Sequence, residues 1–198
     1  MKLIKRFLAI MAAVLLLVGA FLVIHLTMPG WYARWWYPLD YADTIKHYSE
    51  VNKLDPQMVA AVVYQESGFH ADSLSGSGAV GLMQLMPSTA AWIAGKTGEP
   101  APTAAELRQP KTNIRLGCWY LRYLLDRYQD SQVLALAAYN GGAQNVDQWL
   151  AAARTAGEPF NSVVDIPFKE TRDYVSSIDR IKDIYGRAYG NQLHGDVP

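Results

Sequence analysis

An uninterrupted apolar segment near the N-terminus limits how this chain can fold. Phe7–Met28 contains no Lys, Arg, Asp or Glu. As a helix rising ~1.5 Å per residue it would be roughly 33 Å long, enough to cross the hydrocarbon core of a bilayer. The sequence therefore predicts one transmembrane helix followed by a separate domain.

Charge on the two sides of this segment predicts its orientation. Lys2, Lys5 and Arg6 precede it, whereas the short stretch after it carries only Arg34 before the first acidic residue, Asp40. Positive residues collect on the cytoplasmic side, so the remainder of the chain is expected outside the cytoplasm. Aromatic residues of the kind found at membrane interfaces follow the apolar segment at once: Trp31, Tyr32, Trp35, Trp36 and Tyr37.

A cleaved signal peptide is the alternative interpretation of this segment. Signal peptides have a shorter apolar region and a small-residue A-x-A site, and no such site stands between Ala20 and Tyr37. The sequence therefore favours an uncleaved anchor and a single-pass protein of the cell membrane. Under either interpretation the main domain is exported from the cytoplasm.

The composition of the rest of the chain narrows the classes of function. About 160 residues remain, enough for one domain with its own core. Lys+Arg and Asp+Glu balance at 18 each, so nothing indicates the basic surface that nucleic acid requires. The single cysteine, Cys118, lies among apolar residues and is expected to be an inert buried thiol. The four His show no metal-ligand spacing, so neither a metal nor an organic cofactor is expected.

From Leu39 onward the apolar pattern is that of helices interrupted at Gly and Pro. No run shows the alternation of β-branched residues that is typical of strands. Asp55 followed by Pro56 is a strong helix start, and Gly68 a helix end. Trp92, Trp119 and Trp149 are interpreted as core. The sequence predicts a mainly α domain with helices over residues 41–54, 56–67, 87–95, 111–128, 131–140, 143–154 and 170–185.

One carboxylate is out of place in the second of these helices. Val59, Val62, Val63 and Glu66 share one face at i, i+3, i+4 and i+7, so Glu66 extends a face that should point to the core. It also lies in the last turn, where the helix dipole disfavours negative charge. Both effects raise the pKa of a carboxyl group and suit it to donate a proton. An ordinary solvent-facing Glu at a helix end is the alternative.

Four ordered blocks carry a resemblance to a known family. The sequence resembles the lytic transglycosylases of the soluble-type (SLT) catalytic-domain family, which are related to goose-type lysozymes, over about residues 44–185. The blocks are Glu66–Phe69 continuing through Ser75 and Gly78–Pro87 to Thr89-Ala90; Asn113–Gly117 with Trp119–Leu121; Ala137–Gly142 with Val146 and Trp149; and Ile166–Phe168 with Glu170–Arg172 and Tyr174-Val175.

The resemblance implies a lysozyme-like helical domain with a sugar-binding groove. It assigns Glu66 as the catalytic residue. It assigns six further residues to substrate binding: Ser67, Met83, Gln84, Tyr139, Asn140 and Tyr174. Each of the six keeps an alternative role in packing, capping or loop hydrogen bonding. No second carboxylate is implied, and Asp72 is the nearest to Glu66 in sequence.

The implied function is that of a membrane-anchored peptidoglycan lytic transglycosylase. Its substrate is the β-1,4 bond between N-acetylmuramic acid and N-acetylglucosamine, and its products carry 1,6-anhydromuramic ends. Its partners are peptidoglycan glycan strands and, through the N-terminal helix, the membrane; protein partners are not revealed by the sequence. A lysozyme-like muramidase that uses water and an inactive peptidoglycan-binding scaffold are the alternatives.

The expected organisation has four parts. Residues 1–30 are a cytoplasmic tip and transmembrane anchor, 31–43 an aromatic juxtamembrane linker, 44–188 the catalytic domain and 189–198 a flexible tail.

Overall fold

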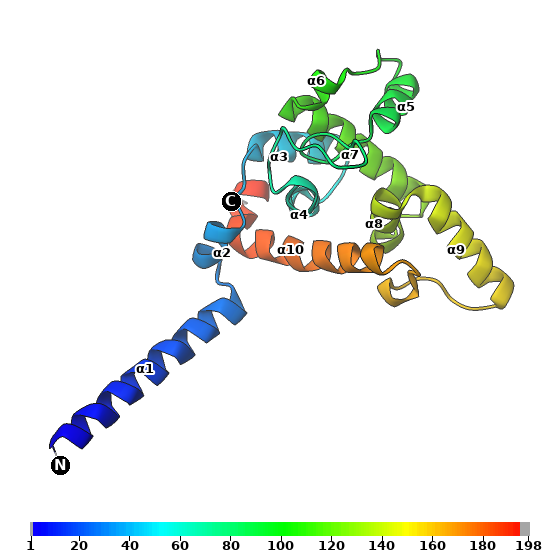
Figure 1. Cartoon of the computed structure of the whole chain (residues 1–198). Coiled ribbons are helices and arrows are strands. Elements are labelled where there is room, and N and C mark those ends of the chain that lie inside the picture. The colour runs from blue at the N-terminus through cyan, green and yellow to red at the C-terminus, as the bar shows by residue number, and fades with distance from the viewer. Residues whose placement is uncertain (1, 195–198) are drawn as a thin grey trace.

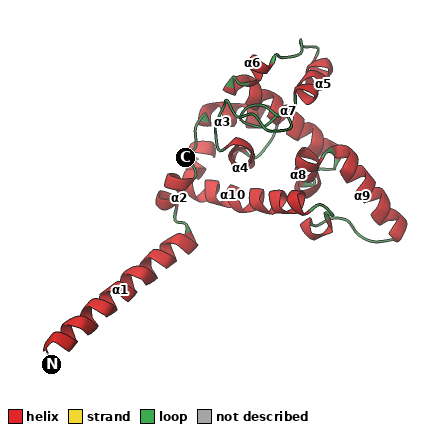
Figure 2. Cartoon of the chain, viewed as in Figure 1, coloured by secondary structure: helices red, strands yellow, loops and turns green. Residues whose placement is uncertain are grey.

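The computed structural model describes residues 2–194, and this part of the chain is built of helices (Figures 1 and 2). Within it the only β pairing is two isolated bridges that join Val80 to Leu74 and to Leu85. The prediction of a mainly α fold is confirmed. The helices are α1 (Lys2–Thr27), α2 (Gly30–Trp36), α3 (Ala42–Val51), α4 (Pro56–Ser67), α5 (Pro87–Thr97), α6 (Ala104–Leu107), α7 (Pro110–Arg127), α8 (Gln132–Gly141), α9 (Ala143–Ala156) and α10 (Lys169–His194), with a 3-10 turn at Val163–Asp165.

The helix α4 begins and ends where the sequence predicts. The Asp55 side chain accepts a hydrogen bond from the backbone N–H of Gln57 at 2.9 Å, and Pro56 occupies the first helical position. Gly68 ends the helix in the left-handed region at φ +59°, which glycine adopts without strain. These helix limits place Glu66 in the last turn of α4.

The main core surrounds α4. Val59, Val62 and Val63 are fully buried, and α4 packs against α10 and α3, with α7 and α8 completing the cluster. Burying an aliphatic side chain stabilises the fold by roughly 1.5–3 kcal/mol, so this face holds α4 firmly. A rigid α4 in turn fixes the position of the carboxyl group at its end.

A smaller lobe lies over α7 and contains α5, α6 and the loop that precedes α5 (Figure 1). Asn113 joins this loop to α7. Its Nδ2 donates to the carbonyls of Val80 and Leu107 at 2.9 and 2.7 Å, and its Oδ1 accepts from the N–H of Met83 at 2.7 Å. Gly81 packs so closely here that a Cβ would lie 2.3 Å from Asn113 Nδ2. The loop therefore has one tight arrangement.

The last helix is longer than expected. The sequence predicts an end near Tyr185 and a flexible tail over 189–198, but α10 continues to His194. The extension is explained by packing, because Ala188 and Leu193 are buried and Tyr189 donates a hydrogen bond to the carbonyl of Tyr37. The expected tail is therefore wrong for residues 189–194, and residues 195–198 lie outside the described part.

The segment expected as a juxtamembrane linker, residues 31–43, is also largely folded. Most of α2 falls in it, and α2 packs against the C-terminal half of α10 through Ala33, Ile184 and Ala188. The sequence of α2 has neither alternating charges nor an apolar stripe confined to one face. The sequence alone therefore did not predict that α2 packs against α10.

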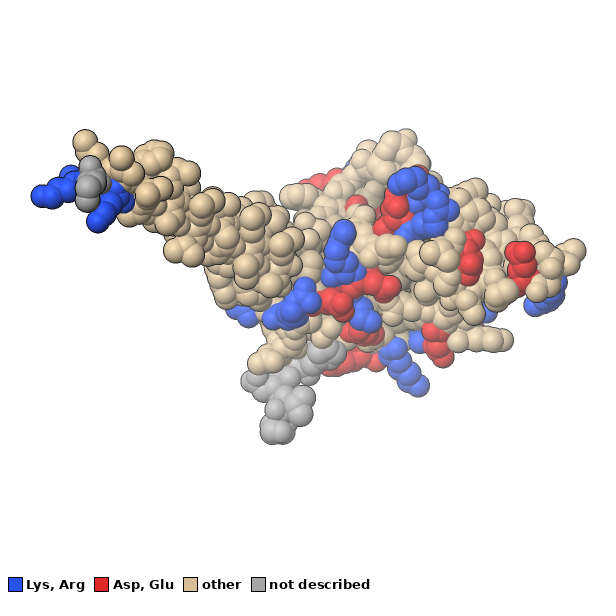
Figure 3. Space-filling model, turned by 90° about the horizontal axis from the view of Figure 1, so that it is seen from below, with Lys and Arg blue, Asp and Glu red and all other residues tan. Residues whose placement is uncertain are grey.

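Among the described residues, α1 is the one helix long and apolar enough to cross a membrane. None of its residues is buried. It projects from the rest of the molecule (Figure 1), and Figure 3 shows its surface free of charged residues except at the N-terminal tip.

The hydrogen bonds of Asn113 predict that this residue contributes strongly to the free energy of unfolding. Asn113→Ala leaves the N–H of Met83 and the carbonyl of Leu107 without a partner, and the carbonyl of Val80 keeps only its bond from Leu85. The substitution is expected to lower the free energy of unfolding by about 3 kcal/mol. Chemical denaturation measures this. Asn191→Ala, on the exposed surface of α10, is the control and should change stability by no more than about 0.5 kcal/mol. An equal effect of both substitutions would contradict the role assigned to Asn113.

Candidate active site

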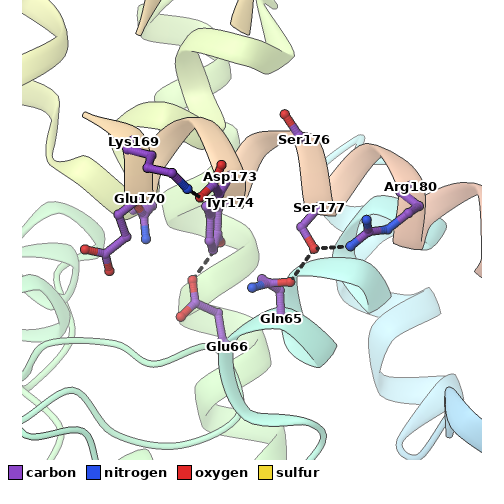
Figure 4. Close-up of a pocket in the computed structure, with 10 residues that line it drawn as sticks. Gln65, Glu66, Lys169, Glu170, Asp173, Tyr174, Ser176, Ser177 and Arg180 are labelled. Atoms are coloured by element: carbon purple, nitrogen blue, oxygen red, sulfur yellow. Dashed lines mark hydrogen bonds and ion pairs between the residues drawn. The ribbon is translucent and has the colours of Figure 1, made fainter. Parts of the chain in front are cut away.

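A pocket of about 810 Å³ lies between the end of α4 and the first half of α10 (Figure 4). Both helices are held by the main core, so the pocket walls are rigid elements rather than loops. Its lining is strongly polar: Gln65, Glu66, Asn140, Lys169, Glu170, Asp173, Tyr174, Ser176, Ser177 and Arg180.

Glu66 is the most perturbed acid in this pocket. Burial raises the pKa of its carboxyl group from 4.5 to about 7. The hydroxyl of Tyr174 donates a hydrogen bond to Glu66 Oε1 at 2.6 Å, which stabilises the carboxylate and opposes part of that rise. The group is thus poised to hold or release a proton near neutral pH. This agrees with the expectation from the apolar face of α4.

Two tyrosines enclose Glu66. Tyr174 comes from α10 and Tyr139 from α8, and the Tyr139 hydroxyl donates to the carbonyl of Met83 at 2.8 Å. Burial, followed by the nearby charge of Glu66, raises the pKa of both phenols well above 10. Both hydroxyls therefore stay protonated and act as hydrogen-bond donors throughout the neutral range.

Ser67 lies outside the pocket lining. Its Oγ donates to the carbonyl of Val63 at 3.1 Å and to the carbonyl of Leu82 at 2.9 Å. The second bond ties the end of α4 to the loop before α5. In this structure Ser67 positions the backbone beside Glu66, and its predicted contact with substrate stays a prediction.

Met83 and Gln84 are likewise not among the pocket-lining residues. The Met83 side chain is 0% exposed and packs on Gly117, where a Cβ would lie 2.3 Å from the Met83 sulfur. This placement does not support the expected contact of the Met83 side chain with a glycan, because the core covers it. Gln84 has a positive φ of 45°, and its Nε2 donates to the carbonyl of Gly81 at 2.8 Å. It braces the loop.

Asn140 does lie at the pocket, as expected. It is exposed at the end of α8, and its Oδ1 accepts a hydrogen bond from Thr171 Oγ1 at 2.9 Å. This bond leaves the Nδ2 donor side of the amide for a ligand. The structure therefore brings Glu66, Asn140 and Tyr174 to one pocket, with Tyr139 next to Glu66.

Apart from Tyr174, the residues that α10 contributes to the pocket wall were not predicted from the sequence. Glu170 is a second carboxylate in the same pocket as Glu66, whereas Asp173 is paired with Lys169. On α4, Gln65 accepts a hydrogen bond from Ser177 Oγ at 2.8 Å. A signal was present: the lining residues recur on α10 at 169/170, 173/174, 176/177 and 180, which is one face of a helix.

A second cleft, of about 400 Å³, lies between α5, α7 and α9. Trp92 and the rings of Tyr120 and Tyr123 line it, and Trp92 is 37% exposed. The expectation that Trp92 is a core residue is therefore wrong, because α5 presents it at the edge of the small lobe. Tyr120 packs on Tyr139 with ring centroids 5.6 Å apart, so this cleft shares a wall with the surroundings of Glu66.

The described residues offer neither a metal centre nor a reactive thiol. Within residues 2–194 no group of three or more His, Cys, Asp or Glu side chains is placed to hold a metal ion. Cys118 is buried, and burial raises the pKa of its thiol, so it is not a nucleophile at neutral pH.

The raised pKa of Glu66 predicts a pH-dependent stability difference. Between its ordinary pKa of 4.5 and about 7 the folded state binds more protons than the unfolded state, so the wild-type chain loses stability as pH rises. Glu66→Gln has no such titration. The stability of Glu66→Gln relative to wild type should increase from pH 4.5 to 8, by at most about 3 kcal/mol. Denaturation at several pH values measures this, and a difference that is flat across the range would refute the raised pKa.

Comparison with known proteins agrees with these features. The family model described as Transglycosylase SLT domain matches residues 43–159. The soluble lytic murein transglycosylase of Escherichia coli K12 is 32% identical over 163 residues, which are 82% of this chain and 24% of that protein. The endo-type membrane-bound lytic murein transglycosylase A of Klebsiella pneumoniae is 41% identical over 101 residues, 46% of this chain and 49% of that protein.

A solved structure shows the same fold. The lytic transglycosylase Slt from Pseudomonas aeruginosa, in an inactive variant in which a Glu is replaced by Gln, superposes with a TM-score of 0.71 at 35% identity. The match covers 78% of this chain and 25% of that one, so this chain spans about a quarter of the length of the soluble relatives. By its family match, its relatives and its fold, the chain belongs to the transglycosylase SLT domain family.

Proposed function

We propose that this chain is a peptidoglycan lytic transglycosylase in which Glu66 acts first as acid and then as base. The observation that carries the proposal is the Glu66 carboxyl group, which has a pKa near 7 and faces a large polar pocket. The names of its relatives support the substrate class, because they are lytic transglycosylases of murein. The inactive Glu-to-Gln variant of the Pseudomonas protein agrees with a catalytic Glu in the family.

The proposed reaction has two proton transfers. In the first, protonated Glu66 donates to the oxygen of the β-1,4 bond while the bond from that oxygen to C1 of muramic acid breaks. In the second, the Glu66 carboxylate takes the proton of the C6 hydroxyl while O6 bonds to C1 and closes the 1,6-anhydro ring. Glu66 regains its proton and no water is consumed. The Tyr174 hydrogen bond stabilises the intermediate carboxylate.

The surroundings of Glu66 fit these two roles. A carboxyl group with a pKa near the working pH is populated in both protonation states and exchanges a proton at small cost. Asn140, which also lines the pocket, offers an amide donor suited to hydroxyl and acetamido oxygens of a sugar. The cleft lined by Trp92 supplies aromatic surface beside this pocket.

The position of Glu170 in the pocket supports a second candidate function. Glycosidases that use water have two carboxylates flanking the bond, one of them a base or nucleophile. Glu170 lines the same pocket as Glu66, so a muramidase that uses both residues is the competing proposal. An inactive peptidoglycan-binding scaffold is the third, and a pKa near 7 at Glu66 argues against it.

We also propose that α1 anchors the catalytic domain to the cell membrane, on the extracytoplasmic side. The apolar length of α1 and the Lys2, Lys5 and Arg6 at its start support this topology, and one relative is membrane-bound by name. The proposed division is an anchor over 1–30, a membrane-proximal segment over 31–43 and the catalytic domain from 44 onward. A cleaved signal peptide is the alternative for α1.

Product analysis of two variants tests the proposed mechanism. On purified peptidoglycan, Glu66→Gln is expected to lose at least 10³-fold of the activity, whereas Glu170→Gln keeps activity within about tenfold. Mass spectrometry of the wild-type products should show ends lighter by one water, and kcat/KM should fall above pH 7 as Glu66 ionises in the free enzyme.

The same experiment separates the alternatives. Hydrated reducing ends together with an inactive Glu170→Gln would establish the two-carboxylate muramidase. An unchanged rate in Glu66→Gln would reject Glu66 as the catalytic residue.

A further inference from the structure

One face of α2 is fixed to the catalytic domain. Ala33 is fully buried, and Arg34 Nε donates to the carbonyl of Ala188 at 2.8 Å while its guanidinium lies 5.3 Å from the centroid of the Tyr189 ring. Gly30 lies so close to α10 that a Cβ would be 2.5 Å from the carbonyl oxygen of Arg187. These contacts hold α2 against the last turns of α10.

The last residue of α2 and the two residues that follow it are held as well. The carbonyls of Trp36, Tyr37 and Pro38 each accept a hydrogen bond from a tyrosine hydroxyl of the domain. The donors and distances are Tyr64 at 3.3 Å, Tyr189 at 2.9 Å and Tyr185 at 2.6 Å. A backbone fixed at three successive carbonyls does not act as a flexible linker.

The other face of α2 is a tryptophan face whose ring contacts in the described structure are with Tyr32 of the same helix. We define it as Trp31, Trp35 and Trp36, whose side chains are 61%, 84% and 58% exposed. It continues from α1, whose residues are all unburied, and it lacks charge because Arg34 is turned to α10. His25 of α1 lies 3.3 Å from the Tyr32 hydroxyl of α2, a contact that joins the two helices.

We propose that the tryptophan face lies in the headgroup region of the bilayer, so that α2 seats the catalytic domain directly on the membrane surface. The inference rests on the proposed anchoring by α1. Its occupant is a lipid surface, because tryptophan prefers the interface and the face adjoins a helix of membrane-spanning length. Through the contacts of α2 with α10, the domain keeps one orientation relative to the membrane.

This arrangement makes α10 a spacer between the membrane and the active site. Ala188 contacts Arg34, and Tyr174 contacts Glu66. The two positions are about 21 Å apart along the helix at ~1.5 Å per residue. The membrane-anchored enzyme would therefore cut only glycan that comes within a set reach of the bilayer, whereas a flexible linker would let it search a larger volume.

Fluorescence of the full chain in phospholipid vesicles tests the lipid contact. Lipids brominated near the headgroup should quench a large part of the wild-type tryptophan emission. The triple variant Trp31→Ser/Trp35→Ser/Trp36→Ser should lose that quenching, and Trp35→Ser alone should lose part of it. Trp92→Ser, which removes an exposed tryptophan distant in sequence from α2, is the matched control and should leave the quenched component unchanged.

A second measurement tests the fixed orientation. A fluorophore on Glu158→Cys, an exposed site on the catalytic domain, reports its distance to acceptor lipids by energy transfer; native Cys118 is buried and does not react. The wild-type chain should give one narrow distance distribution, and Gly30→Val, which displaces α2 from α10, should broaden it. Arg154→Ala, at an exposed position, is the control and should leave the distribution narrow.

The outcomes separate this inference from the function on which it rests. Flotation with vesicles reports anchoring, and digestion of soluble peptidoglycan fragments reports catalysis. If the chain floats and cleaves but wild type and triple variant are quenched alike, the lipid contact is refuted. A broad distribution in the wild type would refute the fixed orientation. Failure of flotation or cleavage would instead refute the proposed anchoring or activity.

Discussion

The hydrogen bond between Tyr174 and Glu66 joins the two helices on which the site depends. It is 2.6 Å long and connects the last turn of α4 to α10. Burial favours the protonated form of the Glu66 carboxyl group, whereas the hydrogen bond from Tyr174 favours the carboxylate. The balance of these two opposing effects leaves the pKa near 7. The chemistry proposed for this protein requires that balance, since one group must give up a proton and then take one.

The position of Glu66 depends in turn on structure that never touches the pocket. Asn113 holds the loop of the small lobe to α7, and Ser67 and Tyr139 bind carbonyls of the same loop, at Leu82 and Met83. This loop passes beside the end of α4. Among the residues that the resemblance assigns to the site, Ser67, Gln84 and Tyr139 hydrogen-bond to backbone carbonyls of this loop. Glu66, Asn140 and Tyr174 line the pocket.

Local signals made much of the fold predictable. Asp55, Pro56 and Gly68 set the limits of α4, and the spacing of Val59, Val62 and Val63 identified its buried face. Glu66 was predictable for the same reason, because a carboxylate on an apolar face is a visible exception. Apart from the C-terminal end of α10, the boundaries of the other predicted helices agree within a few residues, since Gly and Pro lie near many of them.

The features that the sequence did not show depend on tertiary packing. Whether Met83 faces a cavity or the core is decided by Gly117, far away in sequence, and the exposure of Trp92 by how α5 lies on the small lobe. The length of α10 depends on α2, which covers its last turns. Glu170 was overlooked because its face of α10 becomes a pocket wall only when α4 lies opposite.

An infrared titration measures whether one carboxyl group of this protein keeps its proton near neutral pH. With glutamate labelled at the side-chain carboxyl carbon, the carboxylate band should contain one component with a midpoint near pH 7. That component should be absent from Glu66→Gln and should move to higher pH in Tyr174→Phe, which lacks the stabilising hydrogen bond. Titration of every glutamate between about pH 4 and 5, with no component lost in Glu66→Gln, would contradict the account.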